Sequence, residues 1–391
     1  MIINEKRVAQ YYRNFEKAFN SYKYNEPLSR YLTRFYKENR QMGSSDRKMT
    51  SRFLYNLFRI GNAFKSHNLI ERLCFAEFLC ENESSFLALH DSNLHALINN
   101  SIEDKISILE KDYGFILENI FPLINSLSSQ LNIDEFLKSQ FIQPDLFVRV
   151  KTGAEKLFNN LLTDNDIKYK MIREKTYSFN NGFRFQDYPK LKGKYEIQDL
   201  SSQKTIEFMD AQQGESWWDA CAASGGKSLM FLDKYPSIIL LVSDIRLSIL
   251  KNLSERFLNA NSPMPKRQKV IDLTGDIKNI IGNEKFDGIL LDVPCSGSGT
   301  WGRTPEMIQQ FSKDKLNEFT NLQKSIVSNI VPHIKVGKPI VYMTCSVYAD
   351  ENENIVQYLV DNYNFQIEKM ELIKGYNHKA DSMFAARLIK L

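Results

Sequence analysis

The chain has 391 residues, of which 43% are hydrophobic and 25% charged, and its formal net charge is +4. This length allows two or three domains, and the composition is ordinary for a soluble globular protein. No run approaches the 18 apolar residues of a membrane span, and the charged start, Met1–Arg7, lacks the apolar segment of a signal peptide. A cytoplasmic protein without a membrane partner is therefore expected, and the small net charge does not by itself indicate nucleic acid.

The cysteines and histidines argue against a disulfide framework and against a metal site. The cysteines are odd in number and show no C-x-x-C spacing, and the histidines are scattered along the chain. We therefore expect no metal cofactor. The residues concerned are Cys74, Cys80, Cys221, Cys295 and Cys345, together with His67, His90, His95, His333 and His378.

Residues 5–130 show a helical pattern with scarcely any strand signal. Gly43–Asp46 contains a helix stop followed by capping residues, and apolar side chains then recur at the spacing of one helix face across 49–60 and again across 69–80. The pattern predicts an all-α domain over 1–140 whose aromatic residues form a core. Cys74 and Cys80 are expected there as buried, unreactive side chains.

A small α+β domain is predicted over 141–197. Leu146–Val150 resembles a strand, a helix follows, and an Asn-Gly pair in 180–182 predicts a hairpin between Thr176–Phe179 and Phe183–Phe185. Lysines and arginines alternate here with tyrosines and phenylalanines. Such a mixture is typical of a surface that binds phosphate and stacks RNA bases, but a solvated hairpin face has the same composition, and both interpretations stay open.

From residue 198 onward, strands and helices alternate. This alternation predicts a parallel-dominated α/β sheet with helices on both faces and an antiparallel pair of strands at its end. The fold class is therefore a Rossmann-like α/β domain over 198–391, preceded by the helical and α+β domains. The expected strands end near 220, 244, 273, 293, 343, 372 and 390.

The loop after the first of these strands, Cys221–Lys227, has the small residues that allow backbone N–H groups to approach a ligand. It matches neither a dinucleotide fingerprint nor a phosphate-binding P-loop. Asp244, at the second strand end, suits the two hydroxyl groups of a ribose, and either Asp272 or Asp276 suits an adenine amino group. A nucleoside cofactor without phosphate-binding features indicates S-adenosylmethionine.

Two further strand ends carry thiols. Asp292 lies at the carboxyl end of the strand 286–293, Cys295 follows that strand, and Cys345 follows 339–344. Carbon 5 of a pyrimidine is a poor nucleophile, so its methylation calls for a thiolate that adds to carbon 6, a partner for the ring, and a route out of the adduct. The residues alone leave open which thiol attacks, and a DNA cytosine-5 methyltransferase would use the one after proline.

Several motifs in combination resemble the Nop/Sun family of RNA cytosine-5 methyltransferases. The resemblance spans about 143–391. It rests on Asp292–Thr300 with Arg303–Glu306, on Thr344–Ser346 with Glu351–Glu353, on Cys221–Lys227, on Tyr195–Gln203 and on Phe147–Val150. The chain departs from the family pattern at Ser224, where proline is usual, and at Lys151, where asparagine is usual.

The resemblance implies roles for individual residues. Cys345 would be the attacking nucleophile, Cys295 would assist product release, and Asp292 would engage the target base. The implied contacts to S-adenosylmethionine come from Cys221, Ala222, Ala223, Ser224, Gly225, Gly226, Lys227, Asp244, Asp272 and Asp292.

Residues 26–55 are similar, more distantly, to the antiterminator-like helical domain of bacterial small-subunit ribosomal RNA methyltransferases of the RsmB type. The resulting expectation is a monomeric enzyme that forms 5-methylcytosine in RNA, with 16S ribosomal RNA as substrate. Transfer RNA as the substrate, and an RNA-binding assembly factor without turnover, are the alternatives. The target cytidine must be unpaired or flipped out, because stacking hides carbon 6.

Overall fold

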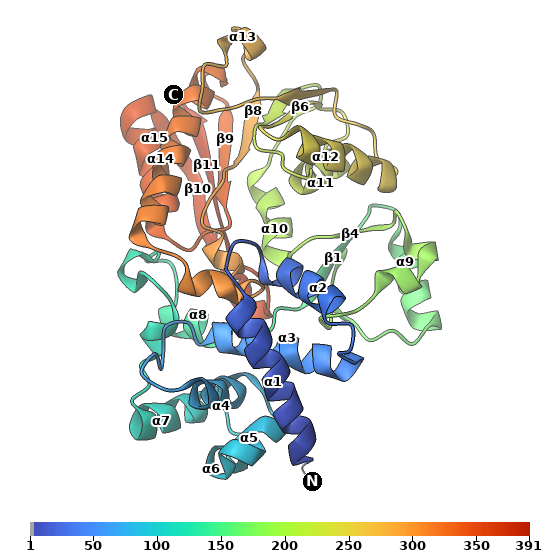
Figure 1. Ribbon diagram of the computed structural model, residues 1–391. Coiled ribbons are helices and arrows are strands. Elements are labelled where there is room, and N and C mark those ends of the chain that lie inside the picture. The colour runs from blue at the N-terminus through green and yellow to red at the C-terminus, as the bar shows by residue number, and fades with distance from the viewer. Residues whose placement is uncertain (1–3) are drawn as a thin grey trace. The chain divides into compact units, whose positions relative to one another are not determined.

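The computed structural model describes residues 4–391 and divides the chain into two compact units (Figure 1). The helical unit comprises the described residues up to Asn125, together with Asn132–Gln143 and Trp301–Ser312. The sheet unit comprises Ser126–Leu131, Pro144–Thr300 and Lys313–Leu391. The three domain ranges expected from the sequence stay a prediction, and residues 1–3 of the first lie outside the described residues.

The helical unit is built from amphipathic helices around an aromatic core. The two helices expected from apolar spacing are present as α3 and α4, and Gly43 caps the start of α3, where its N–H donates to the Asp46 carboxylate at 3.0 Å. Phe15, Phe53 and Phe86 are fully buried, as expected of a core. The helices are α1 (Glu5–Ser21), α2 (Leu28–Glu38), α3 (Ser44–Arg59), α4 (Leu69–Cys80), α5 (Ser85–His90), α6 (Ser92–Ala96), α7 (Ile102–Tyr113) and α8 (Ile133–Ser139).

The segment Trp301–Ser312 belongs to the helical unit although the residues on either side of it belong to the sheet unit. Its Trp301 side chain is 1% exposed, and the ring lies 5.0 Å from that of Phe121. The buried Glu306 carboxylate accepts a hydrogen bond at 3.0 Å from the backbone N–H of Leu28, at the start of α2. The sequence pattern did not predict that this segment packs within the helical unit.

The segment Pro144–Thr300 of the sheet unit begins with a four-stranded antiparallel sheet. Its strands have the order β2-β3-β1-β4. Its elements are β1 (Leu146–Val150), α9 (Glu155–Asp164), β2 (Lys170–Arg173), β3 (Thr176–Phe179) and β4 (Tyr195–Ile197).

The predicted hairpin around the Asn-Gly pair is wrong. Strand β3 pairs with the preceding β2, and Phe185 begins a 3-10 helix instead of ending a strand. Tyr177, Phe179 and Phe185 are at most 4% exposed and form the core of this sheet, so they are not available to stack on bases. Tyr169, which is 42% exposed, keeps a ring at the surface.

The seven-stranded sheet has the order β10-β11-β9-β8-β5-β6-β7, and this confirms the predicted Rossmann-like α/β fold. Strand β11 runs antiparallel to both of its neighbours, β10 and β9. The antiparallel pair of strands predicted at the end of the sheet is therefore present. Helices α14 and α15 lie on one face and α11 and α12 on the other (Figure 1). The strands are β5 (Ser216–Asp219), β6 (Ile239–Asp244), β7 (Arg267–Val270), β8 (Gly288–Asp292), β9 (Pro339–Thr344), β10 (Phe365–Ile373) and β11 (Met383–Lys390). The helices are α10 (Leu200–Lys204), α11 (Gly226–Lys234), α12 (Leu247–Asn259), α13 (Lys278–Ile281), α14 (Lys313–Ile330) and α15 (Glu353–Tyr363).

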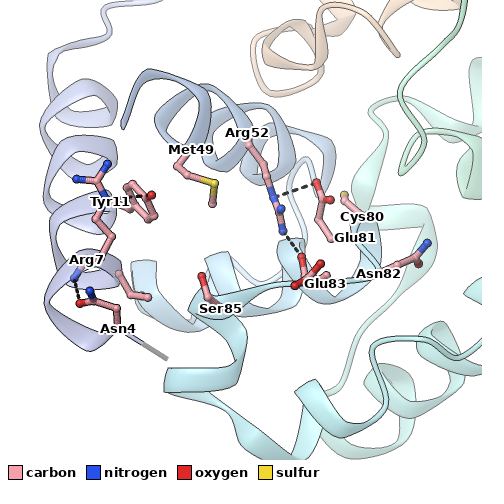
Figure 2. A pocket seen from close by; sticks show the side chains of 11 residues that line it. Asn4, Arg7, Tyr11, Met49, Arg52, Cys80, Glu81, Asn82, Glu83 and Ser85 are labelled. Atoms are coloured by element: carbon pink, nitrogen blue, oxygen red, sulfur yellow. Dashed lines mark hydrogen bonds and ion pairs between the residues drawn. The ribbon is translucent and has the colours of Figure 1, made fainter. Parts of the chain in front are cut away.

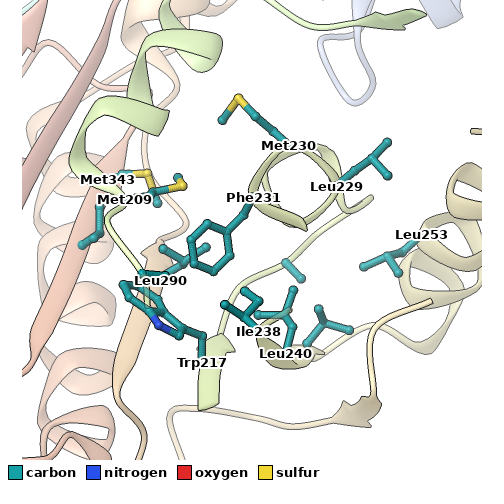
Figure 3. Packing of buried hydrophobic residues seen from close by; sticks show 14 of the residues in the cluster. Met209, Trp217, Leu229, Met230, Phe231, Ile238, Leu240, Leu253, Leu290 and Met343 are labelled. Atoms are coloured by element: carbon teal, nitrogen blue, oxygen red, sulfur yellow. The ribbon is translucent and has the colours of Figure 1, made fainter. Parts of the chain in front are cut away.

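A buried apolar cluster fixes α11 against the sheet (Figure 3). The rings of Trp217 on β5 and Phe231 on α11 are 4.9 Å apart. Gly288 on β8 makes room for this packing, because a Cβ there would lie 2.4 Å from the Trp217 ring. The loop between β5 and α11 is thereby held at both ends. Among residues 4–391, we find no helix whose length and apolar character would let it traverse a membrane.

Candidate active site at the strand ends

Two cavities open at the carboxyl ends of the parallel strands of the seven-stranded sheet. The Asp244 cavity, of about 390 Å³, has apolar walls that include Ile245, Ile271 and Leu322. The Asp199 cavity, of about 320 Å³, lies beside it. Both cavities are lined by Cys221, Ala223, Asp292 and Cys345, so these four residues lie where the two spaces meet.

The structure brings together most residues that the sequence singled out. Gly225 lines neither cavity, and neither does Asp276, the rival of Asp272. Strand β7 ends at Val270, so Asp272 does not end a strand as predicted but lies in the following loop. The predicted residues that line the Asp244 cavity are Cys221, Ala223, Asp244, Asp272, Asp292, Cys295 and Cys345. Those that line the Asp199 cavity are Cys221, Ala222, Ala223, Ser224, Gly226, Lys227, Asp292 and Cys345.

The turn into α11 explains why Gly225 is a glycine. Its φ is +78°, a conformation that other residues rarely adopt, and a Cβ would lie 2.6 Å from the side chain of Leu253 on α12. Ser224, which replaces the proline usual in the family, accepts a hydrogen bond from the Arg256 guanidinium at 3.3 Å. This hydrogen bond restrains the loop, which lacks the rigidity that a proline ring would give it.

The two strand-end thiols are adjacent. Cys345 directly follows β9, Cys295 lies three residues after the end of β8, and their sulfur atoms are 3.4 Å apart. The hydrogen bond with Cys345, together with burial, raises the pKa of the Cys295 thiol well above its ordinary value. Cys295 is therefore held in its protonated form.

An ion pair lies beside the thiols. The Lys227 ammonium donates to the Asp292 carboxylate at 2.6 Å. Burial lowers the pKa of Lys227, but the charge and the hydrogen bond of Asp292, with a smaller effect from Cys345, outweigh it and leave that pKa raised. Lys227, the second residue of α11, is thus a fixed positive charge beside the Asp292 carboxylate at the end of β8.

Asp219, the last residue of β5, is a site residue that sequence reasoning missed. Its carboxylate is 1% exposed, lines the Asp199 cavity and accepts a hydrogen bond from the Ser228 hydroxyl at 2.5 Å. Burial, only partly offset by Ser228 and reinforced by the charge of Asp292, raises the pKa of Asp219 to about 7. An acid at a buried strand end beside a glycine turn was the available signal.

This raised pKa predicts a pH-dependent stability. The native state holds the Asp219 proton up to about pH 7, whereas the unfolded chain releases it near pH 4, so stability falls as the pH rises between these values. Asp219→Asn should remove this component, which amounts to roughly 2–4 kcal/mol. Urea unfolding at pH 5 and pH 8 measures it. The exposed Asp210→Asn serves as the control and should keep the native slope; an unchanged slope in Asp219→Asn would contradict the assignment.

A larger hollow, of about 620 Å³, lies in the helical unit (Figure 2). None of the site residues expected from the sequence lines it. Its arginines are already paired: Arg52 contacts Glu81 at 3.2 Å, and Arg7 contacts Asp46 at 3.3 Å. With its cations neutralised by neighbouring carboxylates, this hollow offers no evident anion site.

Residues 206–389, just under half of the chain, match the family model described as 16S rRNA methyltransferase RsmB/F. Ribosomal RNA small subunit methyltransferase B of Yersinia enterocolitica is 35% identical over 161 residues, which cover 40% of this chain and 36% of that protein. The same protein of Pectobacterium carotovorum is 32% identical over 207 residues, which cover 50% and 46%. The matched region thus spans less than half the length of either relative.

Solved structures extend the likeness of fold to the whole chain. The crystal structure of PH0851 has a TM-score of 0.70 at 20% identity and covers 97% of this chain and 98% of its own. The structure of NSun6 from Pyrococcus horikoshii, determined with SFG, has a TM-score of 0.57 at 15% identity and covers 66% and 94%. These likenesses bear out the Nop/Sun resemblance noted in the sequence, and residues 206–389 are similar to the methyltransferase domain of the RsmB/F family.

Proposed function

We propose that the protein transfers a methyl group from S-adenosylmethionine to carbon 5 of a cytidine in RNA, through a covalent adduct with Cys345. The observation that carries this proposal is the meeting of two cavities at Asp292 and Cys345, with the Cys295 sulfur 3.4 Å from that of Cys345. The Asp244 cavity suits the cofactor, and the Asp199 cavity suits the target base.

The Asp244 cavity fits S-adenosylmethionine. Its apolar walls suit an adenine ring, and Asp244, which is 7% exposed, would accept hydrogen bonds from the ribose hydroxyls. Asp272 would contact the adenine, because it lines this cavity and Asp276 does not. The relative determined with SFG, an analogue of S-adenosylmethionine, supports the same choice. When bound, the cofactor supplies an electrophilic methyl group.

The Asp199 cavity would receive the target base. Asp292 would accept a hydrogen bond from the cytosine edge, and Lys227, which donates to Asp292 at 2.6 Å, would hold that carboxylate in place. The pair thus fixes the base over the Cys345 sulfur, so that attack on carbon 6 needs no further reorientation.

The thiolate of Cys345 adds to carbon 6, and the electron pair of the 5,6 double bond then makes carbon 5 nucleophilic. After methylation, carbon 5 loses its proton to a base, the double bond re-forms, and the carbon–sulfur bond breaks to return the Cys345 thiolate. Cys295, which retains its proton because its pKa is raised, would assist this release by donating a hydrogen bond to the departing Cys345 sulfur.

The relatives' names favour ribosomal RNA, and we infer that 16S ribosomal RNA is the substrate. The four-stranded sheet would contribute phosphate contacts, because its lysines remain exposed while most of its aromatic rings are buried. The exposed cations are Lys168, Lys170, Arg184, Lys190 and Lys192.

Methyl transfer to RNA tests the proposal directly. The purified protein, S-adenosylmethionine with a labelled methyl group, and unmethylated 16S ribosomal RNA should yield label in RNA, and bisulfite sequencing should find one protected cytidine. Transfer RNA and double-stranded DNA serve as parallel substrates. Label in transfer RNA alone would move the substrate assignment, and no label in any nucleic acid would refute the enzymatic function.

A further inference from the structure

A buried carboxylate that the proposed chemistry does not use lies between the two thiol loops. Glu351, in the 3-10 helix Ala349–Glu351, has no exposed surface. Its side chain contacts the residue that follows Cys295 and the residue that follows Cys345. No sequence argument separated Glu351 from its neighbours in the motif.

Toward the Cys295 loop, Glu351 makes two bonds to one residue. The backbone N–H of Ser296 donates to Oε1 at 2.7 Å, and the Ser296 hydroxyl donates to Oε2 at 2.5 Å. Gln323 on α14 strengthens this side, because its amide donates to Oε1 at 3.3 Å and to the Pro294 carbonyl at 3.0 Å. The backbone before and after Cys295 is thereby fixed.

Toward the Cys345 loop, the Ser346 hydroxyl donates to the same Oε2. Ser346 also accepts the backbone N–H of Tyr348 at 3.0 Å, and its carbonyl accepts the Asn352 amide at 2.9 Å. One carboxylate oxygen therefore holds a serine from each thiol loop. The hydroxyl oxygens of those serines, Ser296 and Ser346, are 3.2 Å apart.

All four groups that reach the Glu351 carboxylate can donate to it, and such a set suits an ionised carboxylate. Burial nevertheless raises the pKa of Glu351, because these bonds offset only part of the cost of removing its charge from water. A charged group kept in so dry a place specifies geometry more than stability.

We propose that Glu351 is a positioning residue that sets the distance between the Cys295 and Cys345 sulfurs. Its consequence for turnover rests on the proposed function, since release of the product requires both thiols at one base. The geometric part does not: two thiols held 3.4 Å apart oxidise to a disulfide far faster than two thiols that are free to separate.

The test measures that disulfide. The full chain is treated with diamide, a diazene that takes two electrons and two protons from the thiols and becomes a hydrazine. Peptide mapping of the alkylated protein follows the Cys295–Cys345 bond over time. Glu351→Gln removes the charge at nearly constant volume, and Glu353→Gln, the same change two residues along, is the matched control.

We expect Glu353→Gln to oxidise at the native rate and Glu351→Gln to oxidise on the order of tenfold more slowly. Equal rates in the two variants would overturn the proposal. Should Glu351→Gln fail to fold, Ser346→Ala decides the question: it removes one bond to the carboxylate, so a slowing of about threefold is expected. A native rate in Ser346→Ala would then contradict the positioning role.

Turnover separates this proposal from the proposed function. In Glu351→Gln, kcat should fall while the KM for S-adenosylmethionine stays native, because the cofactor cavity is not lined by Glu351. A protein that shows the disulfide effect but methylates no RNA would keep the positioning role and refute the function. A protein that methylates RNA, and whose thiols oxidise at the same rate with and without the Glu351→Gln substitution, would keep the proposed function and refute the positioning role.

Discussion

Cys345→Ala is expected to abolish methyl transfer, with a loss of about 10⁴-fold or more, because it removes the thiol to which we assign the bond to carbon 6. Binding of S-adenosylmethionine should stay within about twofold of native, since the substitution removes only one atom from the wall of a cavity of about 390 Å³. Labelled methyl transfer and calorimetric titration with the cofactor measure the two effects. Turnover near the native rate would refute the assignment of Cys345 as nucleophile.

Cys295→Ala should behave differently, because attack remains possible while release is impaired. A covalent complex between protein and RNA is expected to accumulate when cofactor and RNA are both present, visible as a band of lower mobility in denaturing gels. The double variant Cys295→Ala/Cys345→Ala is the control and should give no such band. An adduct that forms in Cys345→Ala and is absent in Cys295→Ala would reverse the roles of the two thiols.

Arg59→Ala is expected to destabilise the helical unit by about 3–5 kcal/mol. The Arg59 side chain is 2% exposed and donates to the Gln140 carbonyl at 2.7 Å, the Gln143 side chain at 2.5 Å and the Gly302 carbonyl at 2.9 Å. Its removal leaves the buried Gln140 carbonyl without this donor, takes a partner from the two more accessible acceptors, and opens a cavity. Urea unfolding followed by circular dichroism measures the loss.

Arg30→Ala is the matched control for this experiment. The Arg30 side chain is 81% exposed, and its nearest approach to Glu26, one helical turn away, is 3.8 Å. Exposed pairs of this kind contribute little, so a change within about 0.5 kcal/mol is expected. A similar small change in Arg59→Ala would show that segment 301–312 and the end of α8 do not depend on the buried guanidinium.

The alternation of strands and helices was sufficient to predict the seven-stranded sheet, because each strand's apolar run and each turn agreed. The four-stranded sheet was harder. The prediction rested on the Asn-Gly pair alone, yet the chain turns between β2 and β3 at Lys175, which adopts a φ of +62° that is unusual outside glycine. Tertiary packing of Tyr177 and Phe179 selected that pairing over the stronger turn signal.

The strand-end rule correctly brought Asp292, Cys295 and Cys345 to one place. It could not rank the thiols, because spacing does not encode burial or the hydrogen bond between the two sulfurs, which together raise the pKa of Cys295. Asp219 and Glu351 were missed for a related reason. A single acid in a strand or in a short helix is ordinary in sequence, and its partners, Ser228 for one and Ser296 for the other, become visible only when the chain is folded.

The place of Trp301–Ser312 within the helical unit bears on how the chain is made. A polypeptide leaves the ribosome from its amino terminus, and domains usually fold in that order. Here α2 lacks the Glu306 carboxylate, and Phe121 lacks the Trp301 ring, until residues 301–312 have been synthesised. Helices α1 to α8 must therefore stay incomplete while the strands and helices between them and this segment emerge from the ribosome.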